Sequence, residues 1–398
     1  MERYDVAVIG AGPAGSMAAK KAAEGDANVI ILEEHPRAGW PVQCAGLLGV
    51  RAIEESELPL ATFAIRPVRG AFVVSPGGFQ ITFKSDEVKA WVVDRRLFDR
   101  SLLAKAAKSG VEVGMGCPVT ALVRDDGRSI LTVGRGADRQ KVEAKVVISA
   151  EGVGARIARS VGIDPPREIL SSAQVEVPFE AEDPEKVEIR LGEKVAPGFF
   201  AWAIPAQEGV ARLGLCCREN ACEQLKSFLR SPPIRERIKG GPLHLAVGGL
   251  PLGSPASTIA EGFLAVGDAA GQVKPTSGGG IYPGLVSAKI AGEVASAAAL
   301  EGDASAARLH EYEKRWRSDL GRELRLGMIV HRMRAEMADS EVDDLIRDLS
   351  DREDLIRIIE ECGDIDRPSV VIRKVAPGMG FFSLRMAKIL LRHRKILK

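Results

Sequence analysis

Residues 4–33 carry the strongest structural signal in the sequence, a glycine-rich loop between an apolar run and a helical pattern. Residues 4–9 are apolar and partly β-branched, and the alanine-rich pattern that follows the loop ends near Glu24. A second apolar run covers residues 29–32. We therefore predict a strand, helix, strand unit whose parallel strands are joined by a right-handed crossover and bind a ligand at their carboxyl edge.

The loop itself, Gly10-Ala11-Gly12-Pro13-Ala14-Gly15, matches the GxGxxG fingerprint in its required context. The first glycine permits the tight turn, the second lets the backbone approach a pyrophosphate, and the third lets helix and strand pack closely. Glu33 follows at the end of the second strand, where a carboxylate can accept hydrogen bonds from a ribose. These residues predict an adenine dinucleotide site, and at this point NAD and FAD both remain open.

Two loops far downstream favour FAD. Residues 263–266 form an apolar run that leads into Gly267-Asp268, whose carboxylate can hydrogen-bond the ribityl chain of a flavin, a group that NAD lacks. Gly278-Gly279-Gly280-Ile281 then leads into a helix expected over about residues 284–300, so that bare backbone N–H groups could approach the flavin pyrimidine. Glu151-Gly152 follows a buried strand at 145–150, where it could close over the pyrophosphate.

The remaining segments predict a mixed architecture. At 398 residues, 45% of them hydrophobic, the chain can bury a large core. We expect an α/β, Rossmann-type FAD-binding domain built discontinuously from residues 1–68, 94–168 and 258–302, with a helix over 95–109. Alternating patterns predict an antiparallel-sheet substrate domain from 69–93 and 169–257. Residues 303–398 are expected to be helical, with Leu309, Trp316, Leu320, Leu324 and Met328 on one apolar face.

Composition limits the partners. The 55 Lys and Arg residues offset 54 Asp and Glu residues, so net charge does not indicate a nucleic-acid partner. The six cysteines include no CxxC pair, which argues against a zinc site or an iron–sulfur cluster, so no metal is expected. No leader pattern or membrane-spanning run is apparent, and we expect a cytoplasmic protein. The basic amphipathic segment 386–398 is interpreted either as a peripheral contact with the inner membrane surface or as a helix packed on the protein body.

With these loops in place, the sequence resembles the flavoprotein superfamily that includes para-hydroxybenzoate hydroxylase, and more closely its geranylgeranyl reductase branch of the archaeal digeranylgeranylglycerophospholipid reductase type. The resemblance covers most of the chain. Pro41-Val42-Gln43-Cys44-Ala45-Gly46 resembles the family's Pro-Val-x-Cys-Gly loop near the flavin, and Arg95 matches an arginine that contacts the cofactor. Residues 197–205 resemble its Tyr-x-Trp-x-Phe-Pro substrate motif, with Phe200 in place of Tyr and Ile204 in place of Phe. Glu151 likewise replaces an Asp, and Ala45 a Gly.

The resemblance implies FAD as the cofactor and reduction of carbon–carbon double bonds in the geranylgeranyl chains of archaeal-type ether lipids. Hydride from reduced flavin N5 and a proton would be added across the alkene. Cys44 is the candidate catalytic residue, and Phe199, Phe200 and Trp202 are candidates for binding the isoprenoid lipid. The residues expected at the cofactor are Gly10, Gly12, Pro13, Ala14, Gly15, Glu33, Cys44, Ala45, Arg95, Glu151, Gly152, Gly267, Asp268, Gly278, Gly279, Gly280 and Ile281.

Several alternatives stay open. The same fold hosts aromatic monooxygenases and relatives of electron-transfer flavoprotein dehydrogenase, and fold alone does not determine function. The sequence does not identify the electron donor, because no second nucleotide fingerprint is present, so NADPH, ferredoxin and other donors stay open. Cys44 could also be a small buried hydrophobic residue, and the aromatic residues could be ordinary core.

Overall fold

The computed structural model describes residues 1–136 and 139–375. The first of its three sheets has eight strands and contains the predicted nucleotide unit. In spatial order its strands are β17 (Ile259–Ala260), β18 (Phe263–Ala265), β11 (Gln140–Ser149), β1 (Glu2–Ile9), β2 (Val29–Glu33) and β8 (Glu112–Met115), and the hairpin β9 (Val119–Asp125) and β10 (Arg128–Val133) is attached through β11. The strands β18, β11, β1, β2 and β8 run parallel, so their carboxyl ends lie along one edge. That edge is where an open α/β sheet binds its ligand.

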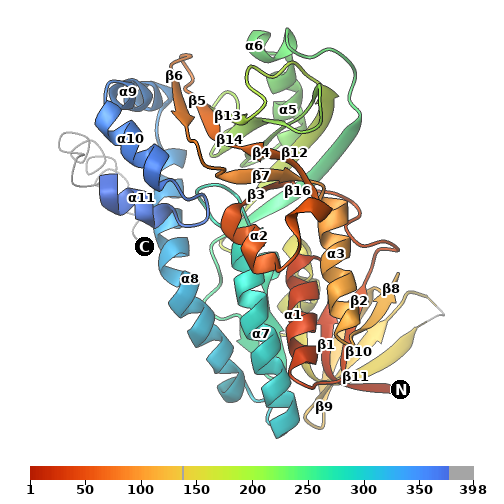
Figure 1. The fold of residues 1–398 in the computed structure, drawn as a ribbon. Coiled ribbons are helices and arrows are strands. Elements are labelled where there is room, and N and C mark those ends of the chain that lie inside the picture. Colours follow the sequence, from red (N-terminus) through yellow and green to blue (C-terminus); the bar gives the residue numbers. More distant parts are fainter. Residues whose placement is uncertain (137–138, 376–398) are drawn as a thin grey trace.

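One face of this sheet is covered by α1 (Pro13–Glu24), α3 (Arg95–Lys108) and α7 (Ile281–Glu301), as Figure 1 shows. The helices α1 and α7 approach each other closely because small residues meet between them. A Cβ added to Gly292 would lie 2.4 Å from the carbonyl oxygen of Ala18, which leaves room only for glycine. The predicted elements at 4–9, 29–32, 95–109 and 145–150 are confirmed within one or two residues at most ends. The helix expected from about residue 284 begins earlier, at Ile281.

The side chain of Glu57, which follows α2 (Val50–Ser56), connects three helices. Its carboxylate contacts Lys20 of α1 at 3.0 Å, Lys105 of α3 at 3.2 Å and Lys289 of α7 at 3.1 Å. Burial works against the charge of Glu57, but hydrogen bonds from Lys20 and Lys289 outweigh it and hold its pKa well below the ordinary range. Three helices are thus joined by one carboxylate.

Glu57→Gln should therefore lower the free energy of unfolding at neutral pH. Because the folded-state pKa is depressed, the carboxylate stabilises the protein above the unfolded pKa of about 4.3, and this contribution is lost as the pH falls. Urea unfolding at pH 7 and again at about pH 4 or below should show a gap between variant and wild type that narrows in acid. A gap independent of pH would contradict this role.

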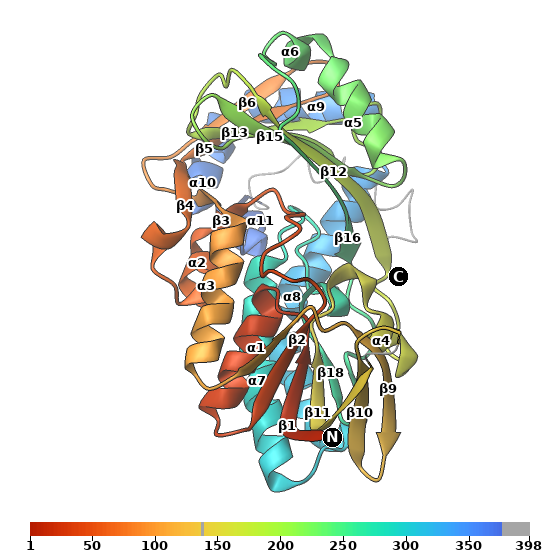
Figure 2. The ribbon, with the colours of Figure 1, turned by 90° about the vertical axis from the view of Figure 1, so that its right-hand side faces the viewer.

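The second sheet has seven strands and lies over the ligand edge of the first (Figure 2). Its spatial order is β16 (His244–Leu252), β12 (Glu168–Pro178), β15 (Val210–Cys217), β14 (Phe200–Pro205), β13 (Lys186–Leu191), β5 (Gly70–Val74) and β6 (Gln80–Lys84). All neighbours are antiparallel except β13 and β5. One face packs on α5 (Ala221–Arg230) and α6 (Pro232–Arg235) through Val175, Leu213 and Phe228. The other face carries a second buried cluster that includes Trp202 and Ile204.

One expected strand belongs elsewhere. Residues 90–93, predicted within the substrate sheet, form β7 (Ala90–Val93) between β3 (Leu47–Gly49) and β4 (Ala64–Val68) in a separate three-stranded sheet. Alternation identified the strand correctly, but it carries no information about which strand pairs with it. The domain boundaries proposed from the sequence stay a prediction.

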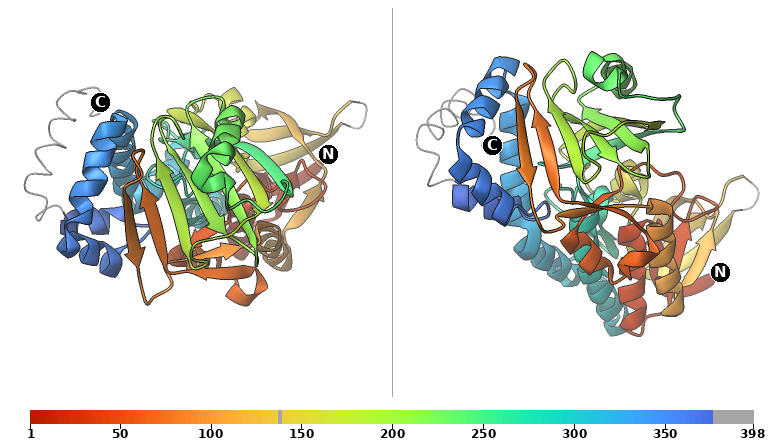
Figure 3. Two further views of the ribbon diagram at one scale, coloured as in Figure 1. Left: turned by 90° about the horizontal axis from the view of Figure 1, so that it is seen from above. Right: turned by 45° about the horizontal axis from the view of Figure 1, so that its top comes forward.

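Helices form the C-terminal part of the described chain. They are α8 (Ala306–Ala335), α9 (Asp339–Ser350), α10 (Glu353–Cys362) and α11 (Pro368–Val375). The short helix α4 (Arg156–Ser160) does not belong to this region and follows β11 of the first sheet. Leu309, Trp316, Leu320 and Leu324 of α8 are buried and Met328 is partly buried, which confirms the predicted apolar face. The blue helices α9 and α10 lie beside the orange strands β5 and β6 in Figure 3, where Val342 and Ile346 pack on Ile81. The segment 386–398 lies outside the described residues. Over the described ranges, each helix is too short or too polar for a bilayer crossing.

Candidate active site

The first glycine loop has the steric environment that the fingerprint requires. A Cβ on Gly10, whose φ is +95°, would lie 2.4 Å from the carbonyl oxygen of Ala150, and a Cβ on Gly15 would lie 1.8 Å from that of Gly10. A Cβ on Gly12 would meet nothing within 4 Å. Gly10 and Gly15 are thus needed for close packing. Gly12 instead faces open space directly before α1, which begins at Pro13. This arrangement fits a pyrophosphate at the helix N-terminus.

Glu33 lies against the same loop. Its Oε2 accepts a hydrogen bond from the Ala11 backbone N–H at 2.7 Å, and its Oε1 accepts one from the His35 backbone N–H at 2.9 Å. An ionised carboxylate offers about four acceptor positions, so acceptor capacity remains for ribose hydroxyls. Glu33 thus lies beside the glycine fingerprint, as predicted. The contact of Glu33 with the cofactor stays a prediction.

The second loop converges on the first. A Cβ on Gly267 would lie 3.1 Å from the Cβ of Ala14, and Gly267 follows β18 at the start of the short helix η3 (Gly267–Ala270). No described residue forms a hydrogen bond or ion pair with the carboxylate of Asp268, and burial raises its pKa although the positive charge of Arg95 opposes this. Asp268 is partly buried, and a carboxylate that is removed from water without a partner is costly. Its position fits a hydroxyl-bearing ligand such as the ribityl chain.

Two polar residues, one just after η3 and one on α8, support this loop. Neither of them was identified from the sequence. The Gln272 side chain accepts a hydrogen bond from the Gly267 N–H at 2.8 Å and donates one to the Tyr312 hydroxyl at 2.9 Å. That hydroxyl donates to the Ala265 carbonyl at 2.7 Å. Because Tyr312 is fully buried on α8, the C-terminal region helps to hold the Gly-Asp loop in place.

The third glycine loop borders both Asp268 and the aromatic residues. A Cβ on Gly280 would lie 2.8 Å from Asp268 Oδ1, and a Cβ on Gly278 would lie 3.6 Å from the Phe199 ring. Gly279 packs against buried Lys274, whose ammonium forms an ion pair with Asp366. This ion pair, which joins the loop to the segment before α11, was also not anticipated. Ile281 is the first residue of α7, as the predicted approach to the flavin pyrimidine requires.

Cys44 lies in a loop beside Arg95. The Cys44 sulfur accepts a hydrogen bond from the Gly46 N–H at 3.3 Å. Arg95 forms two hydrogen bonds to the Asp99 carboxylate, each 3.0 Å long. Burial disfavours the Arg95 cation, but the Asp99 carboxylate and the nearby Cys44 sulfur stabilise it, so that its pKa lies above the ordinary value. The structure therefore brings together the two residues that resemblance alone had paired with the cofactor.

Two buried side chains of the seven-stranded sheet hold the loop that contains Cys44. Gln174 of β12 donates to the Cys44 carbonyl at 3.4 Å and accepts from the Trp202 indole at 3.0 Å. Arg212 of β15 donates to the Ala45 carbonyl at 2.8 Å and to the Val93 carbonyl at 3.1 Å. These contacts fix the loop between the two sheets.

Arg212→Gln should therefore destabilise the protein by about 2–4 kcal/mol, because two buried carbonyls and the ion-paired Glu176 would lose their donor. Urea unfolding followed by far-UV circular dichroism measures the change. A loss below about 1 kcal/mol would mean that the loop is held by other contacts.

Phe199, Phe200 and Trp202 form one buried aromatic cluster. The two phenylalanine rings stack with centroids 4.4 Å apart, and Phe200 meets Trp202 edge-on at 6.2 Å. The Trp202 ring covers Gly214, where a Cβ would lie 2.6 Å from the indole. The cluster is thus part of the core and also borders the loop at Gly278. Its role in binding substrate stays a prediction.

The carboxylate of Glu151 binds backbone N–H groups in the first turn of α4. Its carboxylate accepts hydrogen bonds from the Ile157 N–H at 3.0 Å and the Ala158 N–H at 3.1 Å, so it caps the N-terminus of α4. Gly152 has a φ of +69°, and a Cβ there would meet nothing within 4 Å. Contact of either residue with the cofactor stays a prediction, and Gly152 retains the open backbone that such contact would need.

Comparison with known proteins agrees with this geometry. Residues 5–163 match the model of the FAD dependent oxidoreductase family. A digeranylgeranylglycerophospholipid reductase from Methanocaldococcus jannaschii is 36% identical over 358 residues, which cover 87% of this chain and 91% of the relative. The chain belongs to the digeranylgeranylglycerophospholipid reductase family. Membership in this family confirms FAD as the cofactor for which the two converging loops were predicted.

Solved structures place the reductase family within its fold. A geranylgeranyl bacteriochlorophyll reductase-like protein from Thermoplasma acidophilum has a TM-score of 0.82 and 25% identity, and the alignment covers 100% of both chains. The p-nitrophenol 4-monooxygenase of Pseudomonas putida has a TM-score of 0.70 with 17% identity over 91% of this chain and 97% of its own. The latter likeness shows the shared fold alone. The predicted α/β architecture with a sheet-built second part is confirmed.

Proposed function

We propose that this protein is an FAD-dependent reductase that saturates carbon–carbon double bonds in the geranylgeranyl chains of archaeal-type ether phospholipids. The observation that carries the proposal is the 36% identity, over nearly the whole chain, to a protein named for that substrate. The site supports it because an apolar aromatic cluster borders the glycine loop at Gly278, where a flavin ring would be held.

An isolated trisubstituted alkene is poorly polarised, so its reduction depends on alignment and on a proton for the second carbon. Bound FAD, once reduced, supplies the hydride. The protein must then exclude water and present a proton. Phe199, Phe200 and Trp202 exclude water from the side of the substrate sheet. Cys44 lies at the interface between the sheets, where its sulfur could carry a proton or position the chain, and Arg95 holds it in place.

Electrons reach the flavin from NADPH or from ferredoxin, and anaerobic flavin bleaching by each donor separates the two. We also propose that the protein contacts the inner membrane surface peripherally through residues 386–398, which lie outside the described structure. Co-sedimentation with anionic vesicles should fall when these residues are removed, and equal binding of the truncated protein would dismiss the membrane contact.

Mass spectrometry of lipid products tests the reaction. Dithionite-reduced protein is incubated without oxygen with digeranylgeranylglyceryl phospholipid, and we expect products that gain two hydrogens for each double bond. Products that instead gain oxygen when O₂ and NADPH are supplied would indicate a monooxygenase. Unchanged lipid from protein that is fully loaded with FAD would reject the reductase activity.

A further inference from the structure

A cationic side chain without an ion-pair partner among the described residues lies against the aromatic cluster of Phe199, Phe200 and Trp202. Arg334, near the end of α8, has a buried Nε atom with no hydrogen-bond partner among the described residues. Its Nη2 lies 3.3 Å from His331 Nδ1, and no described carboxylate forms an ion pair with it. Burial lowers the pKa of Arg334 to about 10, although the Cys216 sulfur and Glu168 oppose this, so the guanidinium stays positive at neutral pH. Buried charges normally have a partner.

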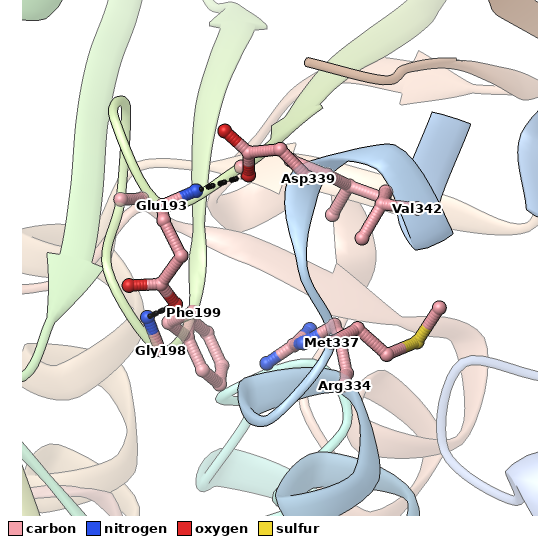
Figure 4. Close-up of a pocket in the computed structure, with 10 residues that line it drawn as sticks. Glu193, Gly198, Phe199, Arg334, Met337, Asp339 and Val342 are labelled. Atoms are coloured by element: carbon pink, nitrogen blue, oxygen red, sulfur yellow. Dashed lines mark hydrogen bonds between the residues drawn. The ribbon is translucent and has the colours of Figure 1, made fainter. Parts of the chain in front are cut away.

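The guanidinium lies next to the residues expected to bind lipid. It lies over the Phe199 ring at 4.5 Å and over the Phe200 ring at 5.3 Å from their centroids. Arg334 also lines a pocket with Gly198, Phe199 and Met337, and Figure 4 shows its side chain pointing toward the Phe199 ring. An N–H donor without a described partner and an aromatic surface thus lie side by side.

The acidic residues around this pocket are already engaged. Glu193 accepts a hydrogen bond from the Gly198 N–H at 3.1 Å and pairs with Arg218 at 3.4 Å. Asp339 accepts from the Glu193 N–H at 2.8 Å, and Glu168 lies 3.1 Å from His331 Nε2. Each of these carboxylates thus already has a partner, whereas Arg334 Nε has none among the described residues.

We propose that Arg334 binds the phosphate group of the lipid substrate while the adjoining aromatic cluster contacts its hydrocarbon chains. A guanidinium is suited to phosphate because its N–H groups can engage two oxygens at once. The ligand class is an anionic lipid phosphate, not a neutral lipid. This inference rests on the proposed function, since it assigns one part of the substrate to one residue.

Equilibrium binding to the FAD-loaded, oxidised protein tests Arg334 separately from catalysis. The probes are a saturated dialkylglyceryl ether with phosphate and the same ether without it. Wild type should bind the phosphorylated lipid more tightly. Arg334→Gln should reduce that advantage by about 10-fold to 100-fold, the range for a hydrogen bond to a charged group. Arg325→Gln, an exposed position on the same helix, is the matched control and should keep the advantage.

The outcomes separate the two proposals. If wild type binds the phosphorylated lipid through Arg334 but reduces no unsaturated lipid, the phosphate site stands and the reductase activity fails. If Arg334→Gln weakens both lipids equally, or neither, the phosphate site is overturned. Inorganic phosphate that binds as tightly as the phosphorylated lipid would also overturn the assignment to a lipid. Should Arg334→Gln not fold, Arg334→Lys should keep part of the phosphate advantage, and full retention would contradict the role of the guanidinium.

Discussion

Protein carrying Gly12→Glu is expected to fold and to remain without FAD. The backbone at Gly12 has a φ of −67°, which any residue can adopt, and a Cβ there would meet no atom within 4 Å. The new side chain therefore costs the fold little. It would place a carboxylate where the structure fits a pyrophosphate, and like charges in contact cost several kcal/mol, so FAD affinity should fall by about 100-fold or more. Flavin absorbance after reconstitution, together with a thermal melt, measures both effects.

Gly241→Glu is the matched control for this experiment. Gly241 is exposed, lies in the loop before β16, and likewise has no atom near its added Cβ. This variant should bind FAD as wild type does. A yellow Gly12→Glu protein with unchanged FAD affinity would show that the first glycine loop does not hold the pyrophosphate.

Cys44→Ala should retain FAD but lose most alkene reduction. The thiol lies beside Arg95 between the two sheets, and its removal leaves the clamps from Gln174 and Arg212 intact because they bind backbone carbonyls of the loop. If the sulfur delivers the proton, the rate should fall by about 100-fold to 10,000-fold, the usual contribution of a positioned acid. Single-turnover reoxidation of reduced flavin by the unsaturated lipid measures that step directly.

Cys222→Ala, at an exposed cysteine of α5, controls for general effects of removing a thiol. It should react at the wild-type rate. Undiminished turnover by Cys44→Ala would remove Cys44 from the mechanism. Partial recovery in Cys44→Ser, with a changed pH profile, would favour proton delivery over mere positioning of the chain.

The glycine fingerprint could be predicted from the sequence because the residue types that it needs stand at a fixed spacing in one hexapeptide. A Cβ on Gly15 would meet the carbonyl oxygen of Gly10, five positions earlier, whereas the contact that constrains Gly10 is with Ala150, which follows the neighbouring strand β11. The convergence of Gly267 on Ala14 follows from one further rule, that neighbouring parallel strands end at the same edge. Periodicity predicted the apolar face of α8 in the same way.

The supports of the site could not be predicted, because each is a polar contact between distant segments. Gln174 and Arg212 lie 130 and 167 residues from the loop carbonyls that they bind. A signal was present at Arg212, the one charged residue of the apolar strand β15, but alternation does not identify its partner, and Gln174 lies among other polar residues of β12. The Lys274–Asp366 pair and the unpaired Arg334 likewise depend on how the C-terminal helices fold back.

The loops at Gly12 and Gly267 are expected to hold one FAD beside the aromatic cluster that is proposed to contact the lipid. The most direct measurement is the flavin absorbance spectrum of the oxidised protein during titration with a saturated dialkylglyceryl phosphate, with lipid binding followed in parallel. We predict a saturable spectral shift whose midpoint equals the binding midpoint, because the lipid replaces water beside the isoalloxazine. Saturable lipid binding that leaves the flavin spectrum unchanged would contradict the claim.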